Sequence, residues 1–308
     1  MKVACIGAGL VGRAWAVVFA RAGHDVALYD RDRSVLDEQA LPGVKETLAL
    51  LAAHGLLEGD VSSVLARITV PDNLAAAVDG AGYVQESIRE DLETKRAAFR
   101  DIADHAPRSC ILASSTSAIK GSDFLCDIEH PERALVAHPV NPPSLIPLVE
   151  LCATDKTSES TVQEAHRLLE TAGMRPITVR KEIDGFILNR LQYTLVAEAM
   201  HLVGEGYCTP EDVDRVMTDG LALRWASIGP FETAHLNASG GFADYVTKLG
   251  PMMKHMGRSA RPDYDWNEVQ AQAIHTAMSQ RTPVTDLPAR QTWRDEQILK
   301  VRKLQKAD

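Results

Sequence analysis

The chain has 308 residues, of which 45% are hydrophobic and 24% charged, a composition typical of a globular protein of about two domains. A net charge of −9 argues against a nucleic-acid partner, because such partners bind to basic faces. No apolar run approaches the roughly 18–20 residues that cross a bilayer, so no membrane partner is expected. The five cysteines are scattered without a CxxC pair, which indicates free thiols in a reducing cytoplasm and no metal site.

The first half of the chain alternates short apolar runs with amphipathic stretches. Strands are expected at residues 2–6, 25–29, 67–70, 81–85 and 109–113, and helices at 10–22, 32–54 and 90–104. This alternation requires crossovers, and therefore predicts a parallel sheet with helices on both faces. Two further apolar runs, 133–138 and 146–151, are joined by Asn141-Pro142-Pro143, and a helix at 158–172 precedes a last run at 175–179.

After about residue 184 the pattern becomes helical throughout. Apolar residues at helical spacing predict a long helix from Phe186 to about Val203, ended by Gly204 and Gly206, and Thr209-Pro210 then begins another helix. Loop breaks are expected near 228–230, 257–263 and 281–288. The sequence thus predicts an α/β Rossmann-type domain over 1–184 and an all-α domain over 185–308. The long helix has more apolar surface than one partner needs, so a homodimer through the C-terminal helices is expected.

A glycine motif directly follows the first predicted strand. Gly7-Ala8-Gly9-Leu10-Val11-Gly12 reads G-x-G-x-x-G and opens a predicted helix, which is the context that dinucleotide binding requires. The first glycine permits the tight turn, the second lets the backbone approach a pyrophosphate, and the third lets the helix pack closely on the sheet. The N-terminus of the helix then directs unpaired N–H groups at the phosphates.

The second predicted strand ends at Asp30. A carboxylate at this place accepts the ribose hydroxyls and repels a 2′-phosphate, so it favours NAD over NADP. Arg31 and Arg33 follow it, and their guanidinium groups are able to hold a 2′-phosphate instead. We therefore expect NAD as the cofactor, with tolerance of NADP left open.

Several segments behind the glycine motif carry a recognisable pattern. They read ASSTSAI at 113–119, HPVNPPSLIPLVE at 138–150, EIDGFILNR at 182–190 and GPFE at 229–232. This set resembles the 3-hydroxyacyl-CoA dehydrogenase superfamily, and within it the λ-crystallin / L-gulonate 3-dehydrogenase branch. The branch also shares DGL, HLNA and WRDE, here at 219–221, 235–238 and 293–296, so the resemblance extends over essentially the whole chain.

The chemistry of an alcohol oxidation fits one pair in these segments. A base must take the hydroxyl proton while hydride leaves for the nicotinamide, and histidine suits this because its unperturbed pKa is about 6.5. His138 ends one predicted strand and Glu150 lies on the next, so the carboxylate meets the imidazole if the strands are adjacent. The resemblance implies the same roles. The alternative is a structural histidine beside Pro139, with Glu150 merely paired on the surface.

The resemblance assigns four further residues. It implies that Ser117 and Asn189 hydrogen-bond the substrate oxygen, and that Glu90 and Lys95 lie along the nicotinamide side of the cofactor, with Ser117 also beside it. Alternatives from the sequence are that Ser117 caps a helix after residue 118, that Asn189 caps its own helix, and that Glu90 and Lys95 are solvated helix residues. Many acyl-CoA members have Asn in place of Ser115, which puts their acyl-CoA contacts in doubt here.

The charge of the segment from 40 to 70 bears on the substrate. The segment contains the cations Lys45 and Arg67. It also contains three acidic residues, Glu46, Glu58 and Asp60, and a net-acidic segment matches the phosphates of CoA poorly. Arg224 precedes the GPFE segment, where acyl-CoA members tend to have small residues. We expect its guanidinium to bind the substrate carboxylate, although a surface or interface salt bridge is the alternative.

These observations predict that the protein is an NAD-dependent dehydrogenase that oxidises a free 3-hydroxy acid of the L-gulonate type to a 3-keto acid. The alternative enzymatic function is that of an L-3-hydroxyacyl-CoA dehydrogenase, or of a reductase of keto acids and their esters. A non-catalytic, crystallin-like protein that keeps the fold is a further alternative from another class.

Overall fold

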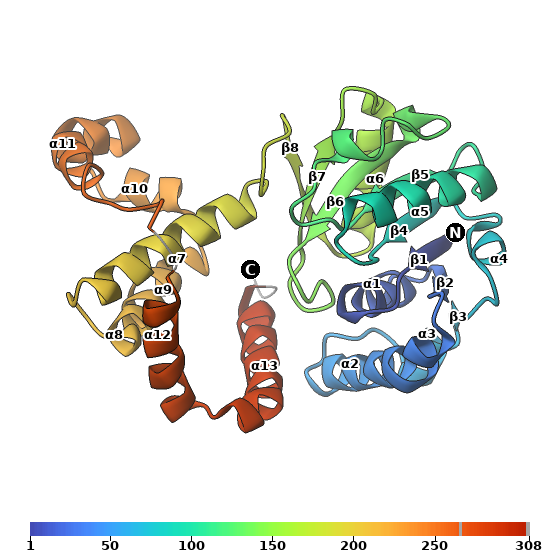
Figure 1. Cartoon of the computed structure of the whole chain (residues 1–308), viewed down its shortest axis with the longest axis horizontal. Helices are drawn as coiled ribbons and strands as arrows, with labels where there is room; N and C mark the ends of the chain where they lie inside the picture. The colour runs from blue at the N-terminus through green and yellow to red at the C-terminus, as the bar shows by residue number, and fades with distance from the viewer. Residues whose placement is uncertain (265–266, 306–308) are drawn as a thin grey trace. The chain divides into compact units, whose positions relative to one another are not determined.

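The computed structural model describes residues 1–264 and 267–305. The chain divides into two compact units, Met1–Asn189 and Arg190–Asp308. The first is an α/β sandwich around one sheet, and the second is helical (Figure 1).

One eight-stranded sheet organises the first unit, in the order β3-β2-β1-β4-β5-β6-β7-β8. All neighbours are parallel except β6 and β7, which run antiparallel because only residues 140–147, without a crossover helix, join them. The strands are β1 (Lys2–Ile6), β2 (Asp25–Tyr29), β3 (Ile68–Thr69), β4 (Tyr83–Glu86), β5 (Ile111–Ser114), β6 (Ala134–Pro139), β7 (Leu148–Ala153) and β8 (Arg175–Val179).

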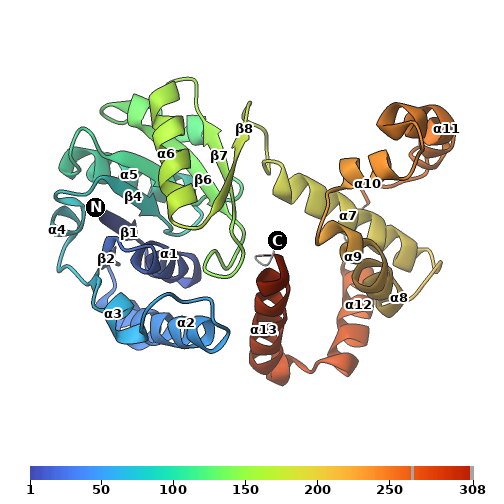
Figure 2. The ribbon, with the colours of Figure 1, turned by 180° about the vertical axis from the view of Figure 1, so that it is seen from behind.

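Helices cover both faces of this sheet, as the alternating pattern predicts. Ala4 and Ile6 of β1 pack into the cluster that holds Phe99 of α5 (Leu92–His105), together with residues of α4 (Leu74–Val78). Tyr83 of β4 instead contacts Phe19 of α1 (Leu10–Arg21), beside which α2 (Leu41–Ala53) packs. Farther along the sheet, α6 (Glu159–Thr171) covers β6, β7 and β8 (Figure 2). Because successive residues of a strand point to opposite faces of the sheet, the central strands contact helices on both sides.

Three local features differ from the expected elements. The helix expected over 32–54 contains a π-helical segment, η1 (Val35–Ala40), before α2. The short helices α3 (Val61–Leu65) and α4 were not predicted, since five residues carry too little periodicity; side chains of Asp60 and Asn73 cap them. The long helix α7 (Leu188–Gly204) begins two residues later than expected, because Phe186 has φ 49° and closes a turn onto Ile183.

The second unit consists of helices connected by short loops. Thr209 caps α8 in a capping box with Asp212, and Pro210 takes the first helical position as expected. The remaining helices are α8 (Pro210–Arg215), η4 (Val216–Leu221), α9 (Ala222–Trp225), α10 (Pro230–Leu236), α11 (Gly241–Met256), α12 (Glu268–Arg281), η5 (Val284–Asp286) and α13 (Leu287–Gln305), and the first unit adds η2 (Gly121–Asp123) and η3 (Pro131–Arg133). Across residues 1–264 and 267–305, the structure has no helix with the length and apolarity of a membrane span.

Candidate active site

The carboxyl ends of the central strands meet at one edge of the sheet. The chain leaves β1 toward β2 and β3 on one side and continues with β4 on the other, so the switch point of the topology lies between β1 and β4. Ligands of open α/β sheets bind at this place. The residues that follow the strands here are Gly7 after β1, Asp30 after β2, Ser87 after β4 and Ser115 after β5.

The glycine loop has the shape that a dinucleotide needs. Gly7 has φ 94°, and a Cβ there would lie 2.6 Å from the carbonyl oxygen of Ser87. A Cβ on Gly12 would lie 1.8 Å from the carbonyl oxygen of Gly7, whereas one on Gly9 would meet nothing within 4 Å. Gly9 is also the N-cap of α1 and makes no side-chain cap, so the first N–H groups of the helix are open to an anionic ligand. The residues present therefore fit a bound pyrophosphate.

A cavity of about 920 Å³ adjoins this loop. Of the predicted cofactor residues, Gly7, Gly9, Asp30 and Arg31 line it. One carboxylate oxygen of Asp30 accepts the N–H of Ala8 at 2.8 Å, which ties the end of β2 to the glycine loop. Arg33 forms an exposed ion pair, with Nε 3.1 Å from Asp37.

The other predicted cofactor residues are not among those that line this cavity; they are Leu10, Val11, Gly12, Glu90, Lys95 and Ser117. Leu10 and Val11 open α1, and Leu10 is exposed. Gly12 lies under the glycine loop, against Gly7.

His138 and Glu150 are brought together by the antiparallel pairing of β6 and β7, in which they are direct partners. Nδ1 of His138 lies 2.8 Å from Oε2 of Glu150. The two residues are 4% and 1% exposed, so the alternative of a surface pair is wrong. A buried carboxylate of this kind fixes the tautomer of the ring and stabilises its protonated form.

The second oxygen of Glu150 holds the start of α7. Oε1 accepts the backbone N–H groups of Ile187 at 2.9 Å and Leu188 at 3.0 Å, which have no partner within the helix. The left-handed turn at Phe186 places its buried ring 5.3 Å from the ring of His138. The imidazole is therefore fixed by a carboxylate at Nδ1 and by an aromatic neighbour.

Ser117 and Asn189 are also linked. The Asn189 amide donates to the backbone carbonyl of Ser117 at 2.8 Å, so it is directed to the loop after β5. Glu150 supplies the hydrogen bonds at the helix start that a capping asparagine would make. Ser117 is exposed in its loop, and the next helical turn, η2, has Lys120 at its N-cap. The alternative that Ser117 caps a helix after residue 118 is therefore wrong.

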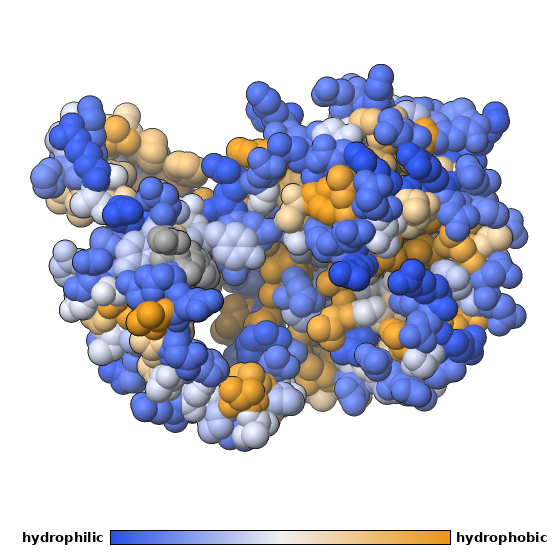
Figure 3. Space-filling model, viewed as in Figure 1, coloured by the Kyte–Doolittle hydropathy of each residue, from blue (hydrophilic) through white to orange (hydrophobic). Residues whose placement is uncertain are grey.

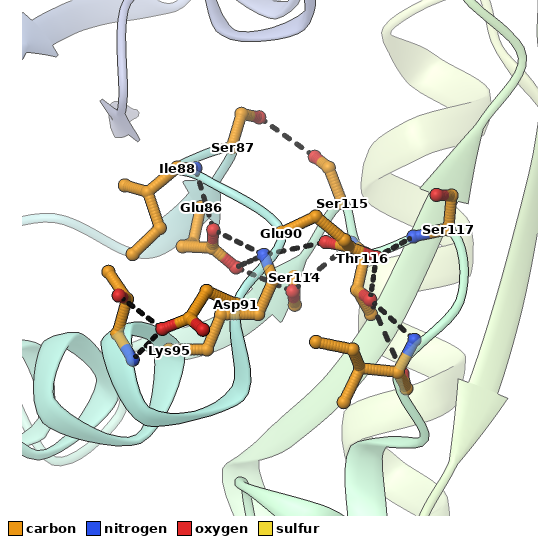
Figure 4. A network of polar contacts seen from close by, with 12 residues as sticks. Glu86, Ser87, Ile88, Glu90, Asp91, Lys95, Ser114, Ser115, Thr116 and Ser117 are labelled. Carbon is orange, nitrogen blue, oxygen red and sulfur yellow. Dashed lines mark hydrogen bonds and ion pairs between the residues drawn. The ribbon is translucent and has the colours of Figure 1, made fainter.

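Glu90 shapes the loop that carries Ser117 (Figure 4). Its Oε1 accepts the Thr116 hydroxyl at 2.6 Å and the N–H groups of Ser117 and Ala118 at 2.8 and 3.0 Å. Partial burial raises the pKa of Glu90, but the bond from Thr116 and the charge of Lys95 outweigh this and lower it overall. Glu90 is thus an ionised anchor for the loop.

Lys95 is only 1% exposed, so the alternative of a solvated helix residue is wrong for it. Its ammonium lies 2.8 Å from Glu86 and 3.3 Å from Glu90 (Figure 4). Glu86 is a buried partner of Lys95 that the sequence did not predict, because the strand was expected to end at residue 85. The available signal was an acid at the end of an apolar strand with a lysine on the helix that follows.

Arg224 lies in α9 of the second unit, where it is exposed. Its contact with a substrate carboxylate stays a prediction.

The family model described as "3-hydroxyacyl-CoA dehydrogenase, NAD binding domain" matches residues 2–183, and the model of the C-terminal domain matches residues 185–279. The chain belongs to the 3-hydroxyacyl-CoA dehydrogenase family. The resemblance seen in the sequence and the α/β Rossmann-type fold followed by a helical domain are confirmed. The glycine loop and its cavity lie in the NAD-binding domain, so this family member uses NAD, which accepts a hydride when bound.

Named relatives of this dehydrogenase family member cover nearly its whole length. The lambda-crystallin homolog of Bos taurus is 41% identical over 98% of this chain and 95% of the relative. L-carnitine dehydrogenase of Oceanobacillus iheyensis is 35% identical over 91% and 87%. Among solved structures, an NAD+-dependent 5-formyl-3-hydroxy-2-methylpyridine 4-carboxylic acid 5-dehydrogenase is similar with a TM-score of 0.84 and 26% identity, covering 98% of this chain and 97% of that one.

Proposed function

We propose that this protein oxidises the 3-hydroxyl of a free 3-hydroxy acid of the L-gulonate type to a 3-keto acid, with NAD as the acceptor. The observation that carries the proposal is the buried contact of 2.8 Å between His138 Nδ1 and Glu150 Oε2. It supplies an imidazole held in one tautomer, at the same sheet edge as the cofactor cavity.

The roles of the residues follow from this geometry. Because Nδ1–H donates to Glu150, Nε2 is the nitrogen that takes the hydroxyl proton of the substrate. The electron pair of the broken O–H bond would form the C3=O double bond, and the C3–H bond would break with its electron pair leaving as hydride, for which bound NAD would be the acceptor. Glu150 stabilises the imidazolium, while Ser117 and Asn189 donate hydrogen bonds to the substrate oxygen.

The electrostatics of the first unit favour a free acid over a CoA thioester. Of the two cations between residues 40 and 70, Arg67 is used inside the fold, with NH1 3.2 Å from the carbonyl oxygen of Gly23. Glu46, Glu58 and Asp60 remain as the acidic majority of the segment. The relatives named for L-carnitine, itself a 3-hydroxy acid, support the same choice. We propose Arg224 as the residue that binds the carboxylate.

Two alternatives have specific support. The family name favours L-3-hydroxyacyl-CoA oxidation. The similarity to a solved diketoreductase favours the reverse reduction of a keto acid or ester. The lambda-crystallin homologs favour a protein that keeps the fold without turnover.

We also propose a homodimer through the second unit. Large apolar side chains are exposed there, and Figure 3 shows apolar residues on its visible surface. Exposed apolar area of this kind marks an interface. It includes Leu191, Tyr207, Leu223, Phe231 and Leu236. Sedimentation equilibrium of the full chain tests this, and a monomer at micromolar concentration contradicts it.

NADH formation separates the three functions. The wild type is assayed with L-gulonate, L-carnitine, other 3-hydroxy acids and 3-hydroxybutyryl-CoA. Turnover of free acids supports the proposal, turnover of the thioester alone supports the first alternative, and no turnover supports the second. His138→Gln is expected to lose roughly 10²–10⁴-fold in kcat. The control His105→Gln changes an exposed histidine of α5 and should leave kcat unchanged.

The Arg224→Met variant tests the carboxylate contact separately. We expect KM for the free acid to rise with little change in kcat, because the contact is made equally in the ground and transition states. An unchanged KM removes Arg224 from the proposal.

A further inference from the structure

A network of polar side chains that the reaction does not use joins the ends of β4 and β5. Its centre is the hydroxyl of Ser115, which has three partners. They are Trp15 Nε1 at 3.1 Å, Gln85 Nε2 at 2.7 Å and Ser87 Oγ at 2.8 Å. The bond between the two serines is visible in Figure 4.

The direction of each hydrogen bond in this network is determined by chemistry. The indole nitrogen of Trp15 only donates. The amide of Gln85 is oriented by Tyr83, whose hydroxyl donates to Oε1 at 2.8 Å, and by the carbonyl oxygen of Ala137, 3.4 Å from Nε2. A flipped amide would place two acceptor oxygens face to face, so Nε2 is the atom that faces Ser115.

Ser115 therefore accepts two hydrogen bonds, and this uses both of its lone pairs. Its own proton has one partner left in the network, the oxygen of Ser87. Trp15, Tyr83 and Gln85 are fully buried, so water does not compete for these positions. The consequence is that Ser87 accepts from Ser115, and its own proton is free to be donated elsewhere.

The free proton of Ser87 is beside the cofactor site. Ser87 follows β4 at the switch point, is half-buried and lines the cavity together with Gly7 and Gly9. Its backbone N–H donates to the carbonyl oxygen of Ile6 at 2.7 Å, and its own carbonyl oxygen lies 2.6 Å from the position of a Cβ on Gly7. These contacts hold Ser87 against the glycine loop.

We propose that Ser87 is an NAD-binding residue whose hydroxyl donates to an acceptor oxygen of the dinucleotide next to the glycine loop. Ser115 is its positioning residue, because it donates to one lone pair of the Ser87 oxygen, which leaves the Ser87 proton to point away from Ser115. A phosphate oxygen suits this donor, since a hydrogen bond to an ionised acceptor is the stronger kind.

NADH affinity without substrate tests the proposal, measured by the fluorescence of the bound nicotinamide. Ser87→Ala should weaken NADH binding about tenfold or more, as expected for the loss of one hydrogen bond to a charged group. Ser115→Ala should weaken it less, and Ser115→Thr, which keeps the hydroxyl, should restore it. Ser160→Ala, at an exposed serine of α6, is the matched control.

The double variant Ser87→Ala/Ser115→Ala distinguishes a positioning role of Ser115 from a general loss of structure at the site. If Ser115 acts through Ser87, then Ser115→Ala has no further effect on NADH affinity in the Ser87→Ala background. An equal loss in both backgrounds overturns the positioning role, and wild-type affinity of Ser87→Ala overturns the binding role. Ser87→Ala alone decides the binding role even if Ser115→Ala does not fold. Because no hydroxy acid is present, these results are independent of the proposed reaction.

Discussion

Replacing Glu150 with glutamine keeps the size of the side chain but leaves it one acceptor oxygen for three donors. The carboxylate bonds His138 at 2.8 Å through one oxygen, and Ile187 and Leu188 at 2.9 and 3.0 Å through the other. If the amide oxygen faces α7, both backbone donors stay satisfied. If the amide oxygen instead faces His138, the backbone N–H groups of Ile187 and Leu188 face the NH₂ group and have no acceptor. An unsatisfied buried donor costs about 1–3 kcal/mol, so the first orientation is favoured by at least that much.

In that orientation the NH₂ group donates to Nδ1 of His138, and the neutral ring carries its proton on Nε2. The nitrogen that should accept the substrate proton is then blocked. We expect kcat for oxidation to fall by roughly 10⁴-fold, as the same tautomer error does in serine-protease triads.

Stability should change far less than activity. The bonds to α7 persist but lose their charge, which costs about 1–2 kcal/mol. At about 2–4 °C per kcal/mol for a domain of this size, the midpoint of thermal unfolding should fall by only a few degrees.

Steady-state kinetics, calorimetry and the ¹⁵N shifts of the His138 ring test these points together, with Glu164→Gln on α6 as the exposed control. Oxidation by the glutamine variant at the wild-type rate would refute the tautomer argument. Collapse of the fold would refute the claim that glutamine preserves the start of α7.

Three further predictions concern the first unit. Asp30→Asn should raise kcat/KM for NADP relative to NAD, because a carboxylate that repels a 2′-phosphate is lost; an unchanged ratio contradicts this. The folded-state pKa of Glu90 is lowered from 4.5, so its stabilising effect is present above that pH and is lost as the pH falls through the lower value. On acidification below about pH 5, the free energy of unfolding should therefore fall less for Glu90→Gln than for the wild type, as measured by urea unfolding. Burial raises the pKa of Cys110 and of Cys152 to about 12, so both thiols should resist iodoacetamide at pH 8 until the protein is unfolded.

Much of the fold is determined by signals within short windows of sequence. Alternating apolar runs specify all eight strands to within two or three residues, and G-x-G-x-x-G specifies the turn into α1. Thr209-Pro210 likewise specifies the start of α8, since a side-chain cap and a fixed φ are local properties. The short helices α3 and α4 and the π-helical segment η1 are not specified in this way, because each is too short to carry a clear periodicity. Tertiary contacts support them instead, α4 against β1 and β2, and α3 and η1 against α2.

The sequence by itself determined which residue types are available at the sheet edge: a histidine and a glutamate on successive strands, a glycine loop and a terminal aspartate. Only the tertiary structure decided their partners. Glu150 bonds the start of α7 across 37 positions, and Trp15 bonds Ser115 across 100. Such contacts depend on strand order and on the direction of each side chain, which no local pattern encodes. For the same reason Lys95 could be read as a solvated helix residue, whereas the structure buries it beside Glu86 and Glu90.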